Sequence, residues 1–339
     1  MGDGHRPFVL AEMSGNHNGD LDRALAIVDA VADAGAQGLK LQTYRADTIT
    51  IDSDQPRFRV GDDHELWGGE NLYALYERAH TPWEWHAPIF ERARERGLVA
   101  FSSPFDRTAI DLLESLDVPA YKIASAEIVD LPLIRLAAST GKPLIISTGT
   151  AHVGEIAAAV EAARGAGCEQ LVVLGCTASY PASPEDSNLR GLPLLRDLFD
   201  CVVGLSDHTH GIGAAVAAVA LGARLVEKHV TLARADGGVD SAFSLEPAEL
   251  ASLVTETERG WQALGQAYVG PTAAEDQTRL LRRSLCVVAD VRAGDVVTSE
   301  NVRSIRPGGG LPPDLIDVVL GRRFTADVAR GTALTWDLV

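Results

Sequence analysis

Two lysines of this chain lie inside apolar runs. Lys40 lies within GLKLQT and Lys122 within AYKIAS. An unpaired ammonium group is costly to bury, so each lysine needs an anionic partner or a shifted pKa. Two interpretations stay open: structural ion pairs with Glu12, Glu127 or Glu227, or a site that binds the phosphate or carboxylate of a ligand.

Two histidines lie at or near the ends of two later apolar runs. His208 follows CVVGLSD, and His229 ends the apolar part of RLVEKHVT. Neighbouring strands of a sheet lie roughly 4.8 Å apart, so two such imidazoles could share a divalent cation, with water and substrate completing its shell. A histidine can equally be a satisfied core residue or a general base, and the pattern alone leaves these alternatives open.

The elements that must position these residues are eight short apolar runs, each followed by a segment with apolar residues at helical spacing. The runs are 8–13, 38–43, 98–104, 120–125, 143–148, 170–177, 201–207 and 224–231. Such alternation predicts an α/β fold, the parallel (β/α)₈ TIM barrel. An open doubly wound sheet is the main alternative, but no GxGxxG follows the first run to support it.

In such a barrel the carboxyl ends of the strands meet at one rim, where the chemistry of TIM barrels takes place. Within the last run, we expect Lys228 to point outward and to pair with a helix, and Glu227 to support a group that binds the ligand. The polar residues that end the runs, or directly follow them, include Glu12, Lys40, Ser103, Lys122, Ser125, Glu127, Thr177, Ser206, His208 and His229.

The pattern changes after residue 264. We predict a barrel over residues 1–264, a polar linker over 265–283 and a small β-rich domain over 284–339, where short strands are broken by Gly, Pro and Asp. Residues 44–73, between the second run and the next helical segment, are far longer than the usual βα connection of about 2–6 residues. Long loops of this kind are commonly lids.

Composition excludes several classes of function. The net charge of −17 disfavours nucleic acid and anionic membranes as partners. No apolar run approaches the roughly 18–20 residues that would span a bilayer. The four cysteines form no CxxC pair, which favours a reducing compartment and gives no zinc signature. The N-terminal residues lack the apolar core of a secretion signal, so we expect a cytoplasmic protein.

Several motifs, taken in order, are similar to those of the sialic acid synthase family. This resemblance implies condensation of phosphoenolpyruvate with an N-acylated amino sugar, giving a nine-carbon α-keto acid and phosphate. It also implies a metal-dependent barrel, a C-terminal SAF (antifreeze-like) domain and a domain-swapped homodimer in which that domain reaches the partner's active site. The motifs are AEMSGNHNGD, LKLQTYRADTIT, TPWEWHAPIF, FSSPFD, AYKIASAE, LIISTG, GLSDHTHGIG, EKHVTLARADGGVDSAFSLEP and RSIRPGGG.

The resemblance also implies roles for single residues. His208 and His229 match the metal-binding pair, with Mn²⁺ the expected ion and Mg²⁺ or Co²⁺ as alternatives. Glu127, Glu12 and Lys122 are the expected catalytic groups, and Arg306 matches a residue supplied by the other subunit. The expected substrate-binding residues are Lys40, Ser103, Ser125, Thr177, Tyr180, Ser206, Asp240 and Arg306.

Two features indicate the branch within that family. Ala178 of CTASYP and the loop ADGGVDSAF resemble the branch that forms pseudaminic acid, whose acceptor is 2,4-diacetamido-2,4,6-trideoxy-L-altrose. The N-acetylneuraminate and legionaminate branches are the alternatives. A barrel that condenses a sugar phosphate would need a further basic cluster. A glycan- or ice-binding role for the C-terminal domain would leave the charged rim unexplained.

Overall fold

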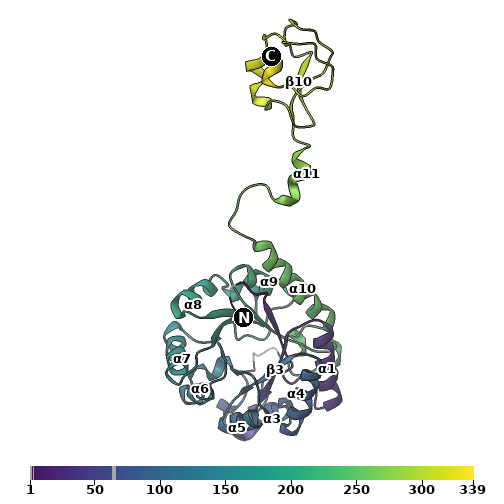
Figure 1. Cartoon of the computed structure of the whole chain (residues 1–339). Helices are drawn as coiled ribbons and strands as arrows, with labels where there is room; N and C mark the ends of the chain where they lie inside the picture. Colours follow the sequence, from purple (N-terminus) through teal and green to yellow (C-terminus); the bar gives the residue numbers. More distant parts are fainter. Residues whose placement is uncertain (1, 3, 63–65) are drawn as a thin grey trace. The chain divides into compact units, whose positions relative to one another are not determined.

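The computed structural model describes residues 2, 4–62 and 66–339. The chain forms two compact units, Met1–Gly265 and Gln266–Val339. Figure 1 colours the chain from the first unit, in purple to green, to the second, in green to yellow. We describe each unit by itself.

The first unit is a closed barrel of eight parallel strands within the described residues, in sequential order. Strand β8 pairs back with β1, from Leu225 opposite Phe8 to His229 opposite Glu12, which closes the barrel. The predicted (β/α)₈ barrel is confirmed. The strands are β1 (Phe8–Glu12), β2 (Gly38–Thr43), β3 (Val99–Pro104), β4 (Tyr121–Ile123), β5 (Leu144–Ser147), β6 (Leu171–Cys176), β7 (Val202–Asp207) and β8 (Leu225–His229).

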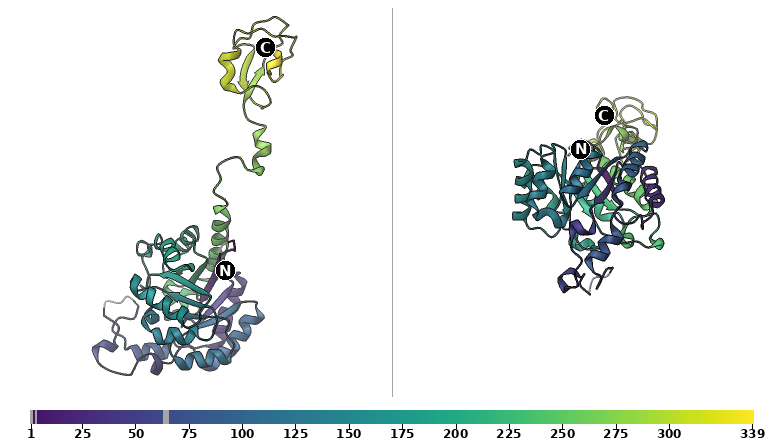
Figure 2. Two further views of the ribbon diagram at one scale, coloured as in Figure 1. Left: turned by 60° about the vertical axis from the view of Figure 1, so that its left-hand side comes forward. Right: turned by 90° about the horizontal axis from the view of Figure 1, so that it is seen from below.

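Helices surround these strands on the outside, as Figure 1 and the two views of Figure 2 show. Asp20 and Asp106 begin α1 and α5 by accepting hydrogen bonds from backbone N–H groups of the first turn. Each helix buries one apolar face against the strands. The helices are α1 (Leu21–Asp33), α4 (His86–Glu95), α5 (Arg107–Ser115), α6 (Leu131–Ala138), α7 (Val153–Gly165), α8 (Gly191–Phe199), α9 (Gly213–Ala220) and α10 (Pro247–Leu264).

The long segment after β2 contains α2 (Ala46–Ile49), a 3₁₀ turn (Pro56–Phe58) and α3 (Leu72–Ala79). Residues 63–65 of the predicted lid lie outside the described residues. Near them the indole N–H of Trp67 donates a hydrogen bond of 3.0 Å to the carbonyl oxygen of Val239. The long segment is therefore attached to the loop that follows β8.

The second unit contains an antiparallel pair of strands, β9 (Ser284–Val287) and β10 (Val302–Ile305). Its own core includes Leu285, Val302 and Phe324. The predicted linker is not wholly irregular, because a 3₁₀ turn (Ala273–Glu275) and the short helix α11 (Asp276–Arg279) lie within it. A further short helix, α12 (Ile316–Val319), follows β10.

Across the described parts of both units, no helix combines the length and apolarity needed to cross a bilayer. The 18-residue helix α10 carries four charged residues, Glu249, Glu256, Glu258 and Arg259, none of them buried.

A buried ion pair joins the ends of β7 and β8. Lys228 and Asp207 are directly opposite each other in the sheet, and Lys228 Nζ lies 2.8 Å from Asp207 Oδ2. Lys228 Nζ also donates to the carbonyl oxygen of Thr209, whose N–H donates to Asp207 Oδ1 at 2.9 Å. The expectation that Lys228 pairs with a helix is wrong, since its partners lie on and just after the neighbouring strand.

Replacing Lys228 by Met should destabilise the barrel by about 3–5 kcal/mol, because Asp207 would remain as a buried charge without its partner. The free energy of unfolding in urea, monitored by a spectroscopic signal of the barrel, measures this loss. The matched control is Arg259→Met, which breaks the exposed pair with Glu256 and should cost less than about 1 kcal/mol. Equal stability of the two variants would contradict a structural role for the buried pair.

Candidate active site

Four ionisable side chains meet inside the barrel. Lys40 Nζ contacts the carboxylate of Glu12 and lies 3.7 Å from Glu227 Oε1. The same oxygen of Glu227 lies 3.2 Å from Lys122 Nζ. Each of the four residues is at most 3% exposed. The ion pairs that the sequence left as one of two interpretations are therefore present, and two positive charges balance two negative ones.

The two lysines differ in how firmly they hold a proton. Burial alone would lower the pKa of Lys40, but Glu12 and Glu227 outweigh it and raise that pKa. Burial lowers the pKa of Lys122. The nearby Glu227 carboxylate acts in the opposite direction, and the charge of Lys40 lowers this pKa further. Burial would raise the pKa of Glu227, yet the two ammonium groups hold it at about 2. Lys122 is thus the lysine whose charge an added anion would stabilise most.

Hydroxyl groups flank these charges. Ser103 accepts a hydrogen bond of 3.2 Å from Lys40 Nζ, and Ser206 donates one of 3.2 Å to Glu227 Oε1. The hydroxyl of Ser147, at the end of β5, is buried and has no hydrogen-bond partner among the residues that the structure describes. Ammonium and hydroxyl donors gathered in this way suit an anion with several oxygens.

The two histidines lie side by side, their ring centroids 5.3 Å apart. His208 Nδ1 donates to the carbonyl oxygen of Thr177 at 2.9 Å, which leaves Nε2 as the acceptor of a neutral ring. His229 Nδ1 is buried, has no hydrogen-bond partner within the described chain, and lies 3.4 Å from Asp240 Oδ2. Asp240 in turn accepts a hydrogen bond from the hydroxyl of Ser14.

His208, His229 and Asp240 are the side chains nearest to one another that could bind the expected divalent ion. The described residues contain no group of three or more His, Cys, Asp and Glu placed to hold a metal. Two imidazole nitrogens beside a carboxylate nevertheless match the ligands of Mn²⁺, provided that water and substrate supply the remaining oxygens. The buried nitrogen of His229 is an unused donor atom of the required kind. The pair therefore fits such an ion, with an incomplete set of protein ligands.

A cavity of about 440 Å³ opens above these charges, within the size range of small-molecule sites. Five of the predicted site residues line it: Ser125, Glu127, Tyr180, His229 and Asp240. His208 packs against the ring of Tyr180, with ring centroids 4.4 Å apart. The remaining predicted residues of the barrel, Glu12, Lys40, Lys122, Ser103 and Ser206, are buried in its interior.

Glu127 is the carboxyl group of this cavity whose proton is most easily exchanged near neutral pH. It lies in the 3₁₀ turn Ser125–Val129 that follows β4. Burial raises its pKa to about 7, Asp130 adds to the increase, and Lys122 opposes it. Its Oε2 is buried and has no hydrogen-bond partner among the described residues. Glu127 can therefore accept or donate a proton during a reaction.

Two predicted residues lie differently from the others. The hydroxyl of Thr177 donates to the carbonyl oxygen of Asp186 at 3.0 Å. Thr177 therefore contacts the site through its backbone carbonyl oxygen, which accepts the hydrogen bond from His208. Arg306 is exposed and belongs to the second unit, directly after β10. Contacts within the first unit therefore say nothing of its role.

The sequence did not indicate several residues that line the cavity. Ser14 lies two positions after Glu12, and Tyr44 directly follows β2, so the strand-end pattern could have found both. Trp67, Leu75 and Tyr76 belong to the long segment after β2. Leu75 and Tyr76 share one face of α3 with Leu72, but an apolar helical face ordinarily indicates packing on the core, so the spacing did not mark a site. Trp67 lies in a turn, where no periodicity applies.

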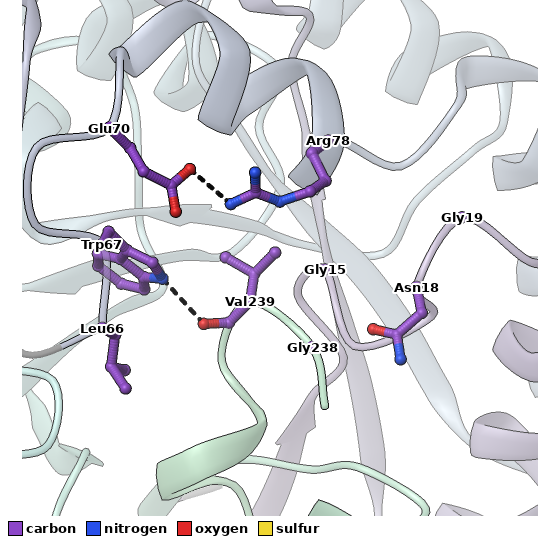
Figure 3. Close-up of a pocket in the computed structure, with 9 residues that line it drawn as sticks. All are labelled: Gly15, Asn18, Gly19, Leu66, Trp67, Glu70, Arg78, Gly238 and Val239. Carbon is purple, nitrogen blue, oxygen red and sulfur yellow. Dashed lines mark hydrogen bonds and ion pairs between the residues drawn. The ribbon is translucent and has the colours of Figure 1, made fainter. Parts of the chain in front are cut away.

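A second cavity, of about 460 Å³, adjoins the first and shares Trp67 and Val239 with it. Figure 3 shows its rim, where the Arg78 guanidinium lies 2.7 Å from the Glu70 carboxylate. The hydrogen bond from Trp67 to Val239 is drawn beside this ion pair. Trp67 thus attaches the segment after β2 to the loop after β8, while the Glu70–Arg78 pair joins two parts of the segment itself.

Comparison with known proteins supports one family over most of the chain. Residues 27–268 match the model of the NeuB family, and residues 282–339 match that of the SAF domain. The chain is 41% identical to the pseudaminic acid synthase of Campylobacter jejuni, over 96% of this chain and 95% of that protein. It is 40% identical to the pseudaminic acid synthase of Helicobacter pylori, over 98% and 97%.

A solved structure supports the same assignment. The N-acetylneuraminic acid synthetase of Leptospira borgpetersenii, crystallised with citrate, superposes with a TM-score of 0.71 at 34% identity, covering 81% of this chain and 90% of that one. The predicted relationship to sialic acid synthases is confirmed by these matches. On the family model, the identity over nearly the whole length and the shared barrel, the chain belongs to the NeuB family.

Proposed function

We propose that this chain is a pseudaminic acid synthase, which condenses phosphoenolpyruvate with 2,4-diacetamido-2,4,6-trideoxy-L-altrose to give pseudaminic acid and phosphate. The observation that carries this proposal is the 41% identity to a synthase of that name over 96% of the chain. The N-acetylneuraminic acid synthetase above is less similar, at 34%. Synthesis of N-acetylneuraminate or legionaminate is the second candidate within the same family.

The interior charges are suited to the first substrate. Phosphoenolpyruvate carries a carboxylate and a phosphate, and we assign these groups to Lys40 and Lys122 with the hydroxyls of Ser103, Ser125 and Ser206. Charge-assisted hydrogen bonds are stronger in a buried site than in water. Lys122, whose pKa burial lowers, would gain most from the negative charge of the ligand. Glu227 would then keep both ammonium groups in place.

The reaction makes one carbon–carbon bond and breaks one carbon–oxygen bond. C3 of phosphoenolpyruvate attacks the aldehyde carbon of the open-chain sugar, whose oxygen takes up a proton, and C2 becomes electron-deficient. Water adds to C2 and releases a proton. In the tetrahedral intermediate the new C2 hydroxyl then gives its proton to the departing phosphate, the C2–O bond to phosphate breaks, and C2 becomes the carbonyl of the α-keto acid. We assign acceptance of the proton from water to Glu127, and contacts with the sugar to Glu12 and Asp240.

His208 and His229 are the residues that would hold a divalent ion, with Mn²⁺ the best match and Mg²⁺ or Co²⁺ as alternatives. When bound, such an ion supplies Lewis-acid polarisation of an oxygen beside it. The chain's own contribution is to orient the rings, since Thr177 fixes His208 and Asp240 lies beside His229. The four cysteines are free thiols, which suits the reducing cytoplasm that we propose as the location.

The proposed function is tested directly by phosphate release. Purified protein with phosphoenolpyruvate and Mn²⁺ should release phosphate with 2,4-diacetamido-2,4,6-trideoxy-L-altrose at least about tenfold faster than with N-acetylmannosamine, a ratio that differences in side-chain contacts can supply. Phosphate is measured colorimetrically and the product by mass spectrometry. Faster turnover of N-acetylmannosamine would contradict the assignment to the pseudaminic acid branch, while the assignment to the family would stand.

Metal binding has its own test. His229→Ala should weaken Mn²⁺ binding by at least about tenfold in calorimetry of the protein without substrate, because it removes one of two imidazole donors. His152→Ala, whose side chain is 77% exposed, is the matched control and should bind as the unchanged protein does. Chelation should abolish turnover and added Mn²⁺ restore it. Full activity of a metal-stripped sample would contradict the assignment of His208 and His229 as ligands of a required ion.

The raised pKa of Glu127 predicts the pH profile. If Glu127 accepts a proton, kcat/KM should fall as the pH drops below about 7, and Glu127→Gln should lose this limb together with about 10²–10⁴ in rate. Its effect on stability has a defined sign. The unfolded carboxyl loses its proton near 4.5 and the folded one near 7, so the unfolding free energy falls as pH rises between these values. If the Glu127→Gln variant kept the fall in kcat/KM at low pH, Glu127 would be excluded as the proton acceptor.

We also propose a domain-swapped homodimer in which Arg306 serves the partner's active site. His229→Ala and Arg306→Ala should each be inactive alone. When the two are refolded together, about half of the dimers should be mixed, and one site in each mixed dimer should be intact. About a quarter of the wild-type activity should therefore return. If Arg306 serves its own barrel, every site carries a lesion and the mixture stays inactive.

A further inference from the structure

The cavity of 440 Å³ has polar and apolar surfaces of different origin. Its acids, amides and serines come from strand ends or the loops that follow the strands, and include Ser14, Gln42, Ser125, Glu127 and Asp240. The segment from α2 to α3 contributes carbon-rich side chains instead. We call four of them, Ile49, Val60, Leu72 and Leu75, the apolar wall.

The apolar wall is flanked by aromatic rings. Tyr44 packs edge to face on Tyr76, with ring centroids 5.6 Å apart, and on Phe105 at 5.2 Å. Trp67 lies against Tyr180, with ring centroids 5.9 Å apart. All five rings belong to residues that line the cavity. The side chains of the wall itself carry no hydrogen-bonding atom, so a sugar hydroxyl placed against them would lose its water without gaining a partner from the wall.

The wall is also held in place by defined contacts. Asn71 begins α3 by accepting hydrogen bonds from the N–H groups of Tyr73 and Ala74, and the N–H of Val60 donates to the carbonyl oxygen of Glu70 at 2.9 Å. Trp67 joins the same segment to Val239, the residue before Asp240 (Figure 3). The wall is therefore fixed relative to the carboxylate beside His229.

We infer that the apolar wall is the specificity element of this site, and that it receives the C6 methyl group of a 6-deoxy amino sugar. This inference rests on the proposed function. The acceptor named there has polar atoms in both acetamido groups and in its hydroxyl groups, whereas its C6 methyl group has none. It is consequently the one position of the sugar chain that needs no hydrogen-bond partner. A 6-hydroxyl group in its place would gain no hydrogen-bond partner from the wall.

The expected selectivity is limited in size. An apolar pocket rejects a substrate that merely adds a hydroxyl by roughly a hundredfold, and a difference of one methylene gives about 10–200-fold. We therefore expect the protein to use the 6-deoxy acceptor with a kcat/KM about ten to a hundred times that for 2,4-diacetamido-2,4-dideoxy-L-altrose, the same sugar with a 6-hydroxyl group.

Two variants test whether the wall causes this preference. Val60→Thr keeps the shape of the side chain and adds a hydroxyl, and Leu72→Asn adds an amide at a half-buried position. Each should reduce the ratio of kcat/KM for the two acceptors at least fivefold, by a loss with the 6-deoxy sugar and a gain with the 6-hydroxy sugar. The control is Leu194→Asn on α8, which is 63% exposed, lies outside the cavity and should leave the ratio unchanged.

The outcomes separate the two claims. If the unchanged protein uses both acceptors equally, or if both wall variants keep its ratio, the wall does not determine specificity while the proposed function stands. If the protein releases no phosphate with either acceptor but does so with N-acetylmannosamine, the proposed function fails and this inference with it. Because Val60 is only half-buried and Thr keeps the shape of its side chain, misfolding of Leu72→Asn would still leave one decisive variant.

Discussion

The position of Glu227 between two buried ammonium groups is the interaction on which this site depends. One carboxylate oxygen lies 3.7 Å from Lys40 Nζ and 3.2 Å from Lys122 Nζ, in a barrel interior that branched apolar side chains usually fill. Removing one partner from such a buried group leaves an uncompensated charge, which costs about 3–5 kcal/mol. The closed barrel brings these strands together, and the charges in turn require a closed barrel with this register.

The mouth of the barrel divides its tasks among different segments. Strand ends supply carboxylates, imidazoles and hydroxyls, whose placement follows from backbone pairing. The segment after β2 supplies apolar and aromatic surface, and Trp67 joins it to the loop after β8. The residues that select the acceptor can thus change without changing those that carry out the reaction, because side chains of the long segment can vary without disturbing the register of the strands.

The sequence predicted the barrel because its apolar runs and helical segments alternate regularly, and it predicted charged groups at the strand ends. It named Glu227 as one of three possible partners of Lys122 but could not choose among them, since Lys122 and Glu227 are 105 positions apart and come together only when the barrel closes. The helix partner predicted for Lys228 was wrong because cross-strand register places Asp207 directly opposite it. The apolar wall escaped prediction because Ile49 and Val60 lie on a four-residue helix and an irregular stretch, and because the helical spacing of Leu72 and Leu75 is that of an ordinary core-facing helix.

A crystal structure of the protein with phosphoenolpyruvate would test most directly whether the buried ammonium groups form an anion site. The phosphate and carboxylate oxygens should lie about 2.7–2.9 Å from Lys40 Nζ and Lys122 Nζ, the usual range for charge-assisted hydrogen bonds, with Glu227 still beside both lysines. Phosphoenolpyruvate bound elsewhere, with Lys40 and Lys122 in contact only with Glu12 and Glu227, would contradict this assignment and reduce the four charges to structural ion pairs.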